Sequence, residues 1–229
     1  MNDSSQRSIR HVTDFGVLPL PKHLHWLSEA EHSELVTWRD HQRREQWLAG
    51  RWIAKRLLCL STLSEELRRV EILSRTAAGL GSQPRVIIDG KRLDRRLSIS
   101  HAGRSVLVGL GAPHSKIGVD LALGVPHSER FRAAWFSPRE NAWLGNSPGR
   151  RGPILWGLKE AIFKAQADGQ AWNPRAVEVL AIENSLVYSE LNGRVLTPLT
   201  AWIRPAEGGA ATVVWDTSRD TIRYRGKTS

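Results

Sequence analysis

The spacing of apolar residues predicts two groups of helices along the chain, each followed by a group of strands. Apolar residues recur at helical spacing over residues 43–58 and 154–165, and a shorter helix is expected at 129–135. Apolar runs bounded by turn residues predict strands at 70–73, 85–88, 97–100, 105–110, 116–122, 177–182, 186–191 and 212–215. Because helices and strands fall in separate blocks, we predict an α+β fold.

Capping signals mark the beginnings of two shorter helices. Ser28 with Glu31 three residues later forms a capping-box pattern, which predicts a helix up to about Trp38. Ser137 and Glu140 repeat the pattern and predict a second such helix.

The segment before residues 154–165 is rich in glycine and arginine. We expect residues 145–152 to form a loop, with Pro153 in the first turn of the helix and Asp168-Gly169 at its end.

Glycine-containing segments predict turns between the strands. We expect a loop at 79–84, a hairpin turn at Asp89-Gly90 and a turn at His101–Gly103. Residues 1–10 and the basic tail after Asp220 are expected to be frayed.

The order of elements repeats, with the change near residues 112–116. Residues 47–52 and 155–160, each with a tryptophan in a long helix, occupy comparable places. We therefore predict two pseudo-symmetric α+β halves, residues 1–112 and 113–229.

Composition indicates a globular protein of a reducing compartment. The chain has 229 residues, of which 41% are hydrophobic, enough to bury a core. Its single cysteine, Cys59, cannot form an internal disulfide and is expected to be a buried residue of a helix. The apolar patch at 15–20 is too short for a signal peptide or a membrane span, so we expect a cytoplasmic protein without a membrane partner.

The charge indicates anionic partners without choosing among them. A net charge of +10 suits nucleic acid, phosphorylated small molecules or acidic proteins. The nucleic-acid hypothesis rests on charge alone, because the chain has no recognisable reading motif or single continuous basic stripe. The ten tryptophans mostly follow apolar periodicity and are expected in the core.

Three residues of the helix at 154–165 form a candidate functional cluster. Trp156, Glu160 and Lys164 are spaced four apart and therefore project from one face. The alternative is an ordinary surface pair of Glu160 and Lys164, worth about 0.2–0.5 kcal/mol.

Asp120 is a candidate partner for this group. It ends an apolar strand pattern, and with Glu160 it could supply two of the oxygen ligands that Mg²⁺ prefers. The alternative is an aspartate in a turn at the strand end.

Further residues offer donors for phosphate. Ser100 and His101 precede small residues between two strands, although a satisfied turn histidine is the alternative. Arg44, Arg51 and Lys55 form a cationic flank on the helix at 43–58, or else ordinary solvated surface. Glycine-rich phosphate loops and zinc-binding patterns are absent from the sequence.

Three motifs together resemble the longer, monomeric class of 4′-phosphopantetheinyl transferases, over about residues 25–215. They are Ser98–His101, Gly118–Asp120 and Trp156–Lys164, the last being the specific one. Arg44 and Arg51 match basic positions of the family's N-terminal helix, and Phe136–Pro138 matches the segment after its metal strand.

The resemblance implies a fold, an activity and partners. The family has two pseudo-symmetric α+β halves with coenzyme A in the cleft between them. It transfers the 4′-phosphopantetheine arm of coenzyme A to a serine of an acyl or peptidyl carrier protein and releases adenosine 3′,5′-bisphosphate. We accordingly expect a monomer that uses Mg²⁺ and binds coenzyme A and a carrier protein, but no nucleic acid.

The resemblance also implies residue roles. Asp120 and Glu160 would bind Mg²⁺, and Glu160 would act as, or position, the base for the incoming serine. Lys164 would contact the phosphate under attack. Ser100 and His101 would contact the nucleotide phosphates of coenzyme A. Arg44 and Arg51 would lie near its 3′-phosphate.

Two departures from the family pattern leave a second hypothesis open. Ala122 stands where the family usually has a metal-binding glutamate, and Ser82-Gln83-Pro84 replaces a Gly-Lys-Pro-like phosphate contact, which Arg85 could cover. The chain could therefore bind coenzyme A or a carrier protein without turnover. The carrier, if any, is expected near the basic residues Arg130, Arg132, Arg139, Arg150 and Arg151.

Overall fold

The computed structural model has an α+β architecture with helices on two opposite flanks of the central strands. It describes residues 12–17, 21–59, 63–75, 81–125, 128–166, 169–206, 208–216 and 223–225, and of 12–17, 206 and 223–225 only the backbone. In the described part of the chain, no helix is long and apolar enough to cross a membrane.

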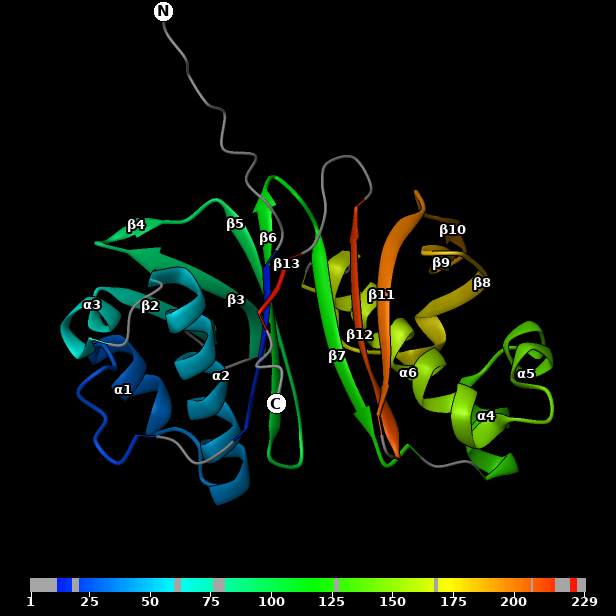
Figure 1. Cartoon of the computed structure of the whole chain (residues 1–229), viewed down its shortest axis with the longest axis horizontal. Coiled ribbons are helices and arrows are strands. Elements are labelled where there is room, and N and C mark those ends of the chain that lie inside the picture. Colours follow the sequence, from blue (N-terminus) through cyan, green and yellow to red (C-terminus); the bar gives the residue numbers. More distant parts are fainter. Residues whose placement is uncertain are drawn as a thin grey trace, which may run out of the picture.

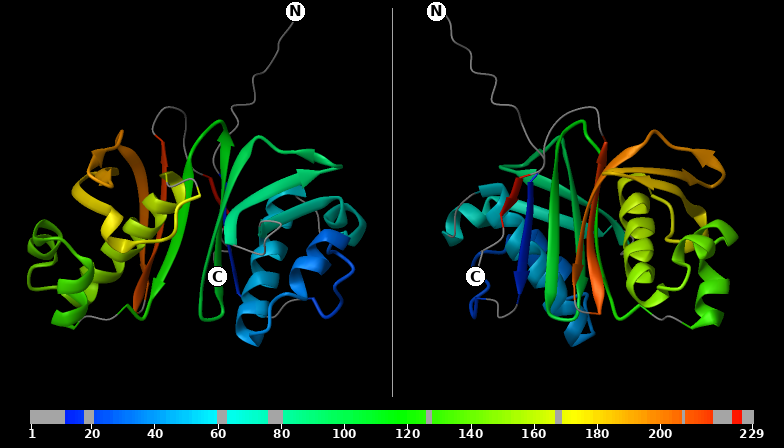
Figure 2. Two further views of the ribbon diagram at one scale, coloured as in Figure 1. Left: turned by 180° about the vertical axis from the view of Figure 1, so that it is seen from behind. Right: turned by 45° about the vertical axis from the view of Figure 1, so that its right-hand side comes forward.

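The elements follow one another in blocks, as the apolar pattern predicts. In chain order they are β1 Val12–Val17, α1 Glu29–Leu35, α2 His41–Cys59, α3 Ser64–Arg68, β2 Val70–Arg75, β3 Gly81–Ile88, β4 Lys91–Arg92, β5 Arg95–Ala102, β6 Ser105–Pro113, β7 Ile117–Leu123, α4 Glu129–Trp135, α5 Pro138–Leu144, α6 Pro148–Gln166, the 3-10 helix Pro174–Ala176, β8 Val177–Glu183, β9 Leu186–Leu191, β10 Arg194–Val195, β11 Leu199–Ala206, β12 Gly209–Asp216 and β13 Arg223–Arg225. Figures 1 and 2 show α1 to α3 and α4 to α6 on opposite sides of β6 and β7.

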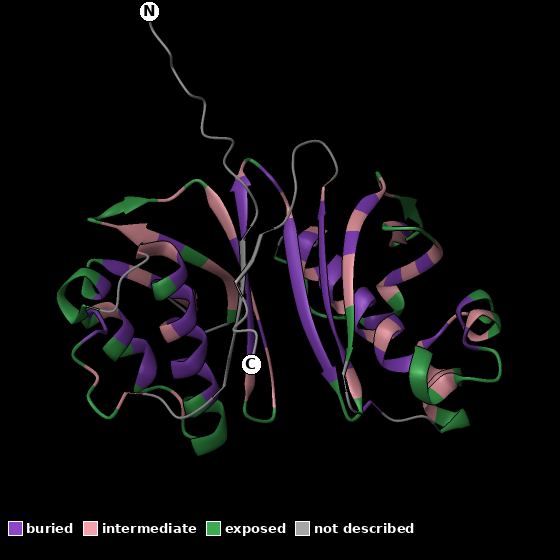
Figure 3. Ribbon diagram, in the orientation of Figure 1, coloured by how far each residue is buried: buried purple, intermediate pink, exposed green. Residues whose placement is uncertain are grey.

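The strands of the described residues form three sheets. Their orders are β13-β1-β6-β5, β2-β3-β4 and β10-β9-β11-β12-β7, with β8 paired to β9. Strands β6 and β7 are buried along nearly all of their length (Figure 3), because each has apolar side chains packed on it from both directions.

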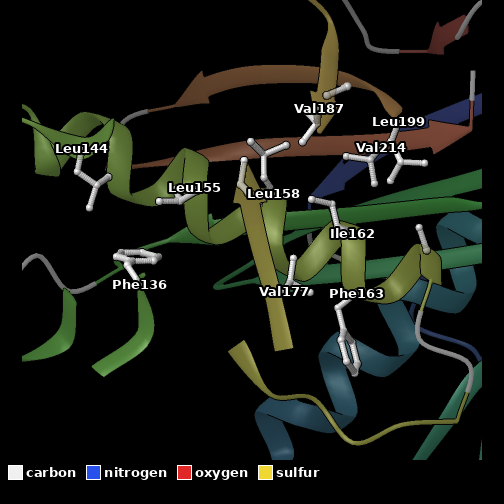
Figure 4. Packing of buried hydrophobic residues seen from close by; sticks show 14 residues of the cluster. Phe136, Leu144, Leu155, Leu158, Ile162, Phe163, Val177, Val187, Leu199 and Val214 are labelled. Atoms are coloured by element: carbon white, nitrogen blue, oxygen red, sulfur yellow. The ribbon is translucent and has the colours of Figure 1, made fainter. Parts of the chain in front are cut away.

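In the N-terminal half, α2 covers the sheets with one apolar face. Ala49, Ile53 and Leu57 of this helix pack with Val70 and Val108, among others, in a single buried cluster. In the C-terminal half, α6 does the same against β8, β9, β11 and β12, where Leu158, Ile162 and Val214 meet, as Figure 4 shows.

Helix α6 lies so close to β7 and β12 that glycine is required at two contact points. A Cβ atom on Gly118 of β7 would lie 1.8 Å from the carbonyl oxygen of Ala161. A Cβ atom on Gly157 of α6 would lie 2.8 Å from Thr212 Oγ1. These two glycines let the helix backbone rest on the strands, and this contact brings the polar residues of α6 next to those of β7.

Both predicted capping boxes are present, and each extends into a buried ion pair. Glu31 caps α1 with Ser28 and also bonds Lys55 of α2 and the backbone N–H of Ile72. Glu140 makes the same set of contacts in the C-terminal half. It caps α5 with Ser137 and also bonds Lys159 of α6 and the backbone N–H of Val179.

The order of elements repeats as well. The series β1, α1, α2, β2 to β6 corresponds to β7, α5, α6, β8 to β12, and both long helices have 19 residues. Helices α3 and α4 and strand β13 have no counterpart in this series. Two pseudo-symmetric halves, and their division into residues 1–112 and 113–229, stay a prediction.

Several boundaries differ from the predictions. Helix α6 begins at Pro148 instead of Pro153, so residues 148–152 are helical and Pro153 lies inside the helix. Pro148 suits the first turn, where a missing N–H costs nothing, and the packing of α6 holds the helix together around Pro153. The helix ends at Gln166; Gly169 follows with a φ of 71°, while Asp168 lies outside the described residues.

The turns between the N-terminal strands are also shorter than expected. Strand β3 begins at Gly81, so residues 81–84 of the expected loop at 79–84 belong to a strand. Residues 79–80 lie outside the described part. His101 and Ala102 belong to β5, so the turn is Gly103-Arg104.

Some strands have no clear signal in the apolar pattern, and one of them, β11, is eight residues long. Strands β1, β4, β10, β11 and β13 were not predicted. Residues 223–225 of the expected frayed tail pair with β1, whereas residues 1–10 lie outside the described part. Cys59 ends α2 and is half-buried.

Candidate active site

Asp120 of β7 meets Glu160 and Lys164 of α6 where the helix rests on the strand. The ammonium Nζ of Lys164 lies 2.7 Å from Asp120 Oδ1 and 3.3 Å from Glu160 Oε2. Trp156 Nε1 donates to Glu160 Oε1 at 3.0 Å, so the three helix residues share one face, as their spacing predicts. Asp120 is buried inside β7, which excludes the turn-aspartate alternative. Lys164 and Glu160 are half-buried and Lys164 also pairs with Asp120, which excludes an ordinary surface pair.

Burial and mutual charge shift the pKa values of this group. Burial raises the pKa of Glu160, and the carboxyl group of Asp120 raises it further, while Lys164 acts in the opposite direction. Burial alone would lower the pKa of Lys164, but the charges of Asp120 and Glu160 outweigh it and raise that pKa. The lysine therefore stays charged, and Glu160 is a stronger base than an ordinary glutamate.

Strand β5 brings Ser100 and His101 to the same place. Ser100 is buried, and its hydroxyl lies 2.7 Å from Asp120 Oδ1, 3.1 Å from the N–H of Leu121 and 3.3 Å from Lys164 Nζ. His101 is half-buried, and burial, together with the charges of Arg43 and Lys164, lowers its pKa. Arg43 and Lys164 line the same cavity as His101, so two cationic side chains lie on the wall that His101 shares with them.

Two adjoining cavities open between the N-terminal and C-terminal elements. The first has a volume of about 600 Å³, and Asp120, Glu160 and Lys164 line it from one side and Gln42 and Arg43 from the other. The second, of about 570 Å³, has aromatic and apolar walls that include Trp38, Leu97 and Phe163. The two cavities share the side chains of Arg43, Gln46, Ile99, His101 and Lys164.

The cationic flank of α2 is arranged differently from the expectation. Lys55 and Arg51 are buried, so neither is solvated surface. Lys55 pairs with Glu31, and Arg51 donates to Glu34 Oε1 at 3.0 Å and to the carbonyl of Ile72 at 3.3 Å. Burial lowers the pKa of Arg51 to about 10.

Arg51 still lines the second cavity, but its charge is already balanced by Glu34. Arg44 is exposed and is not among the residues that line either cavity, whereas Arg43 lines both. Sequence reasoning therefore missed Arg43, because neighbouring helix positions point about 100° apart and the sequence does not say which one faces the cleft.

Trp172 is another residue that the sequence did not single out. It was grouped with the core tryptophans, and Trp26, Trp47 and Trp215 are indeed buried. Trp172 instead is 37% exposed and lines the first cavity beside Glu160. Its only sequence signal is its place shortly after the end of α6.

The two departures from the family pattern are visible in the site. Ala122 is buried on the face of β7 that meets α6, where a Cβ atom added to Gly157 would lie 3.4 Å from the Cβ of Ala122. An alanine has no carboxylate, so this position adds no third oxygen ligand. Gln83 lines the second cavity and donates to the carbonyl of Lys164 at 3.4 Å. Arg85 donates to the carbonyl of Arg75 and is not among the residues lining that cavity.

The donor set at Asp120 and Glu160 fits a hard divalent cation. Two adjacent carboxylates that share one lysine carry a net negative charge, and Mg²⁺ usually takes one or two carboxylates with waters and substrate phosphates. Among the described residues, no group of three or more His, Cys, Asp or Glu side chains could hold a metal ion, which agrees with the alanine at position 122.

A comparison with protein families matches residues 116–203 to the 4′-phosphopantetheinyl transferase superfamily. The matched stretch contains β7, α6 and therefore Asp120, Glu160 and Lys164, so the resemblance seen in the sequence is confirmed there. It supports a role as a phosphopantetheinyl transferase. No curated protein matches the chain.

Proposed function

We propose that the protein transfers the 4′-phosphopantetheine arm of coenzyme A to a serine of an acyl or peptidyl carrier protein. One observation carries the proposal: Asp120, Glu160 and Lys164 converge from two elements on the wall of a cleft cavity, next to a second cavity with aromatic walls. This is the composition expected of a site that holds a nucleotide diphosphate and a metal ion.

In this proposal the two cavities bind different parts of coenzyme A. The adenosine part would lie in the second cavity, against Trp38 and Phe163, and the diphosphate where the cavities join, near Arg43, His101 and Lys164. The pantetheine phosphate would then lie in the first cavity, beside Asp120 and Glu160.

The residues have complementary roles in the transfer. The serine oxygen of the carrier attacks the phosphorus that bears the pantetheine arm, and the bond from this phosphorus to the bridging oxygen breaks. The bridging oxygen leaves with adenosine 3′,5′-bisphosphate, and the serine proton passes to Glu160 or to a base that Glu160 positions. Lys164 stabilises the charge on the transferring phosphoryl group. Mg²⁺ held by Asp120 and Glu160 would neutralise charge on the diphosphate.

The proposal is tested with purified protein, Mg²⁺, coenzyme A and apo carrier proteins. We expect the carrier to gain the mass of one phosphopantetheine group, and Asp120→Ala to lose this activity, because a charged ligand in such a site is worth several kcal/mol. Absence of a mass shift with any of several carriers, or a mild defect in Asp120→Ala, would contradict it.

A second candidate is a protein that binds coenzyme A or a carrier without turnover, and Ala122 is the observation that favours it. Calorimetry separates the two functions: coenzyme A binding that does not depend on Mg²⁺, together with an unchanged carrier mass, would support the second. The proposal also includes a cytoplasmic monomer, which the single cysteine and the family resemblance support.

A further inference from the structure

Two serines of β5 connect this strand to β7 through their side chains. Ser98 Oγ accepts a hydrogen bond from the N–H of Val119 at 3.0 Å, and Ser100 Oγ accepts one from the N–H of Leu121 at 3.1 Å. Both serines are buried. Because β5 pairs with β6 and β7 pairs with β12, the two hydroxyl groups link the sheet of the N-terminal half to that of the C-terminal half.

Ser100 differs from Ser98 in what else its hydroxyl contacts. Asp120 Oδ1 lies 2.7 Å away and Lys164 Nζ 3.3 Å away. A serine hydroxyl has one hydrogen to donate and two lone pairs. The Leu121 N–H and the Lys164 ammonium are both donors and take the lone pairs, so the hydrogen must go to Asp120.

This arrangement leaves Ser100 no hydrogen for a substrate phosphate. The family resemblance suggests that Ser100 contacts the nucleotide phosphates, but here its full hydrogen-bonding capacity is used inside the protein. His101, the next residue on β5, lines both cavities and remains available for that contact.

We propose that Ser100 is a positioning residue for the carboxylate of Asp120, whereas Ser98, which also lines the second cavity, connects the strands without a hydrogen bond to Asp120. Oδ1 of Asp120 is held from two directions, by the hydroxyl of Ser100 in the N-terminal half and by the ammonium of Lys164 in the C-terminal half. The contact from Ser100 therefore forms only when β5 is docked on β7. The inference rests on the proposed function, because it takes Asp120 as a ligand of Mg²⁺.

Hydrogen bonds to metal-binding carboxylates fix their orientation, and their loss typically lowers metal affinity or activity about 10- to 100-fold. Ser100→Ala should therefore weaken Mg²⁺ binding by about that factor. Ser98→Ala is the matched control, since it removes the same kind of hydroxyl from the same strand and also leaves one β7 N–H unpaired.

The experiment measures Mg²⁺ affinity by calorimetry in the presence of coenzyme A, and the melting temperature, for wild type, Ser98→Ala, Ser100→Ala and Ser100→Thr. We expect similar losses of melting temperature in the two alanine variants, weaker Mg²⁺ binding only in Ser100→Ala, and restored binding in Ser100→Thr. Equal Mg²⁺ affinity in Ser98→Ala and Ser100→Ala would overturn the inference while leaving the proposed function intact. A wild type that binds neither coenzyme A nor Mg²⁺ would overturn both.

Discussion

Lys159 and Glu140 form a buried ion pair in which the lysine ammonium lies 2.7 and 2.6 Å from the two carboxylate oxygens. Glu140 Oε1 also accepts from the N–H of Val179 at 2.9 Å, so the pair joins α5, α6 and β8. Glu160 is the next residue of α6. The pair therefore fixes the rotation of the helix directly beside the candidate catalytic carboxylate.

We predict that Lys159→Met lowers the free energy of unfolding by about 3–5 kcal/mol, because Glu140 would be left as a buried charge without a partner. The matched control is Lys55→Met, which removes the equivalent partner of Glu31 in the other half. Urea unfolding should show similar losses for both variants. Turnover per folded molecule should fall only for Lys159→Met, since Lys55 is followed by Arg56 and not by a site residue; an equal fall in both would refute the positioning role of Lys159.

Glu34 should provide a pH-dependent part of the stability. Burial alone would raise its pKa, but the hydrogen bond from Trp47 and the charge of Arg51 outweigh burial and lower the pKa below the ordinary value of 4.5. The native state then binds fewer protons than the unfolded state, so this contribution is complete above the unfolded pKa and is lost as the pH falls through the folded one.

Urea unfolding between pH 7 and about pH 3 tests this. Glu34→Gln should be less stable than wild type at pH 7, by about 1–3 kcal/mol, and should lose less stability toward acid. Glu31→Gln is the control, with the opposite effect on the acid dependence. Burial raises the pKa of Glu31, so this group gains stability as the pH falls, and its replacement should increase the loss toward acid. A Glu34→Gln variant with the same acid dependence as wild type would show that other carboxylates account for it.

Ala122→Glu should restore a third carboxylate beside Asp120. Ala122 is buried on the face of β7 that meets α6 at Gly157, so the longer side chain must shift this close contact to reach the site. We expect half-maximal turnover at a lower Mg²⁺ concentration, because an added oxygen ligand strengthens binding of a hard cation. A Mg²⁺ titration of turnover checks this; loss of activity in a folded variant would mean that the alanine makes space for another group.

Arg150→Glu should slow association with an acidic carrier protein. Arg150 is exposed at the start of α6, in the basic segment between Asp120 and Trp156. Complementary charge acts mainly on the encounter rate, so kcat/KM for the carrier should fall at low salt, and the difference should shrink at high salt. Arg151 is left unchanged because its guanidinium donates to the carbonyl of Trp143.

The matched control for this charge reversal is Arg92→Glu, on the exposed strand β4 of the other half. It changes the net charge equally but lies away from the basic segment. Coenzyme A affinity should be unchanged in both variants. Equal kcat/KM in Arg150→Glu and wild type at low salt would remove this segment from the docking surface.

The sequence by itself determined the features that depend on neighbours within one element. Both capping boxes could be predicted, because a serine and a glutamate three residues later satisfy each other's backbone N–H groups locally. The shared face of Trp156, Glu160 and Lys164 likewise follows from the helical repeat alone. Trp156, Glu160 and Lys164 also belong to the most specific of the three motifs that carried the family resemblance.

Only the tertiary structure decided how these elements face one another. Lys164 meets Asp120 across 44 positions of sequence, and the close approach that allows it depends on Gly118 and Gly157. The helical repeat fixes the angles between side chains but not the rotation of the whole helix, so it could not show that Arg51 turns inward to Glu34 and that Arg43 faces the cleft. Packing sets that rotation, because the apolar face of each helix must be covered by the sheet beside it.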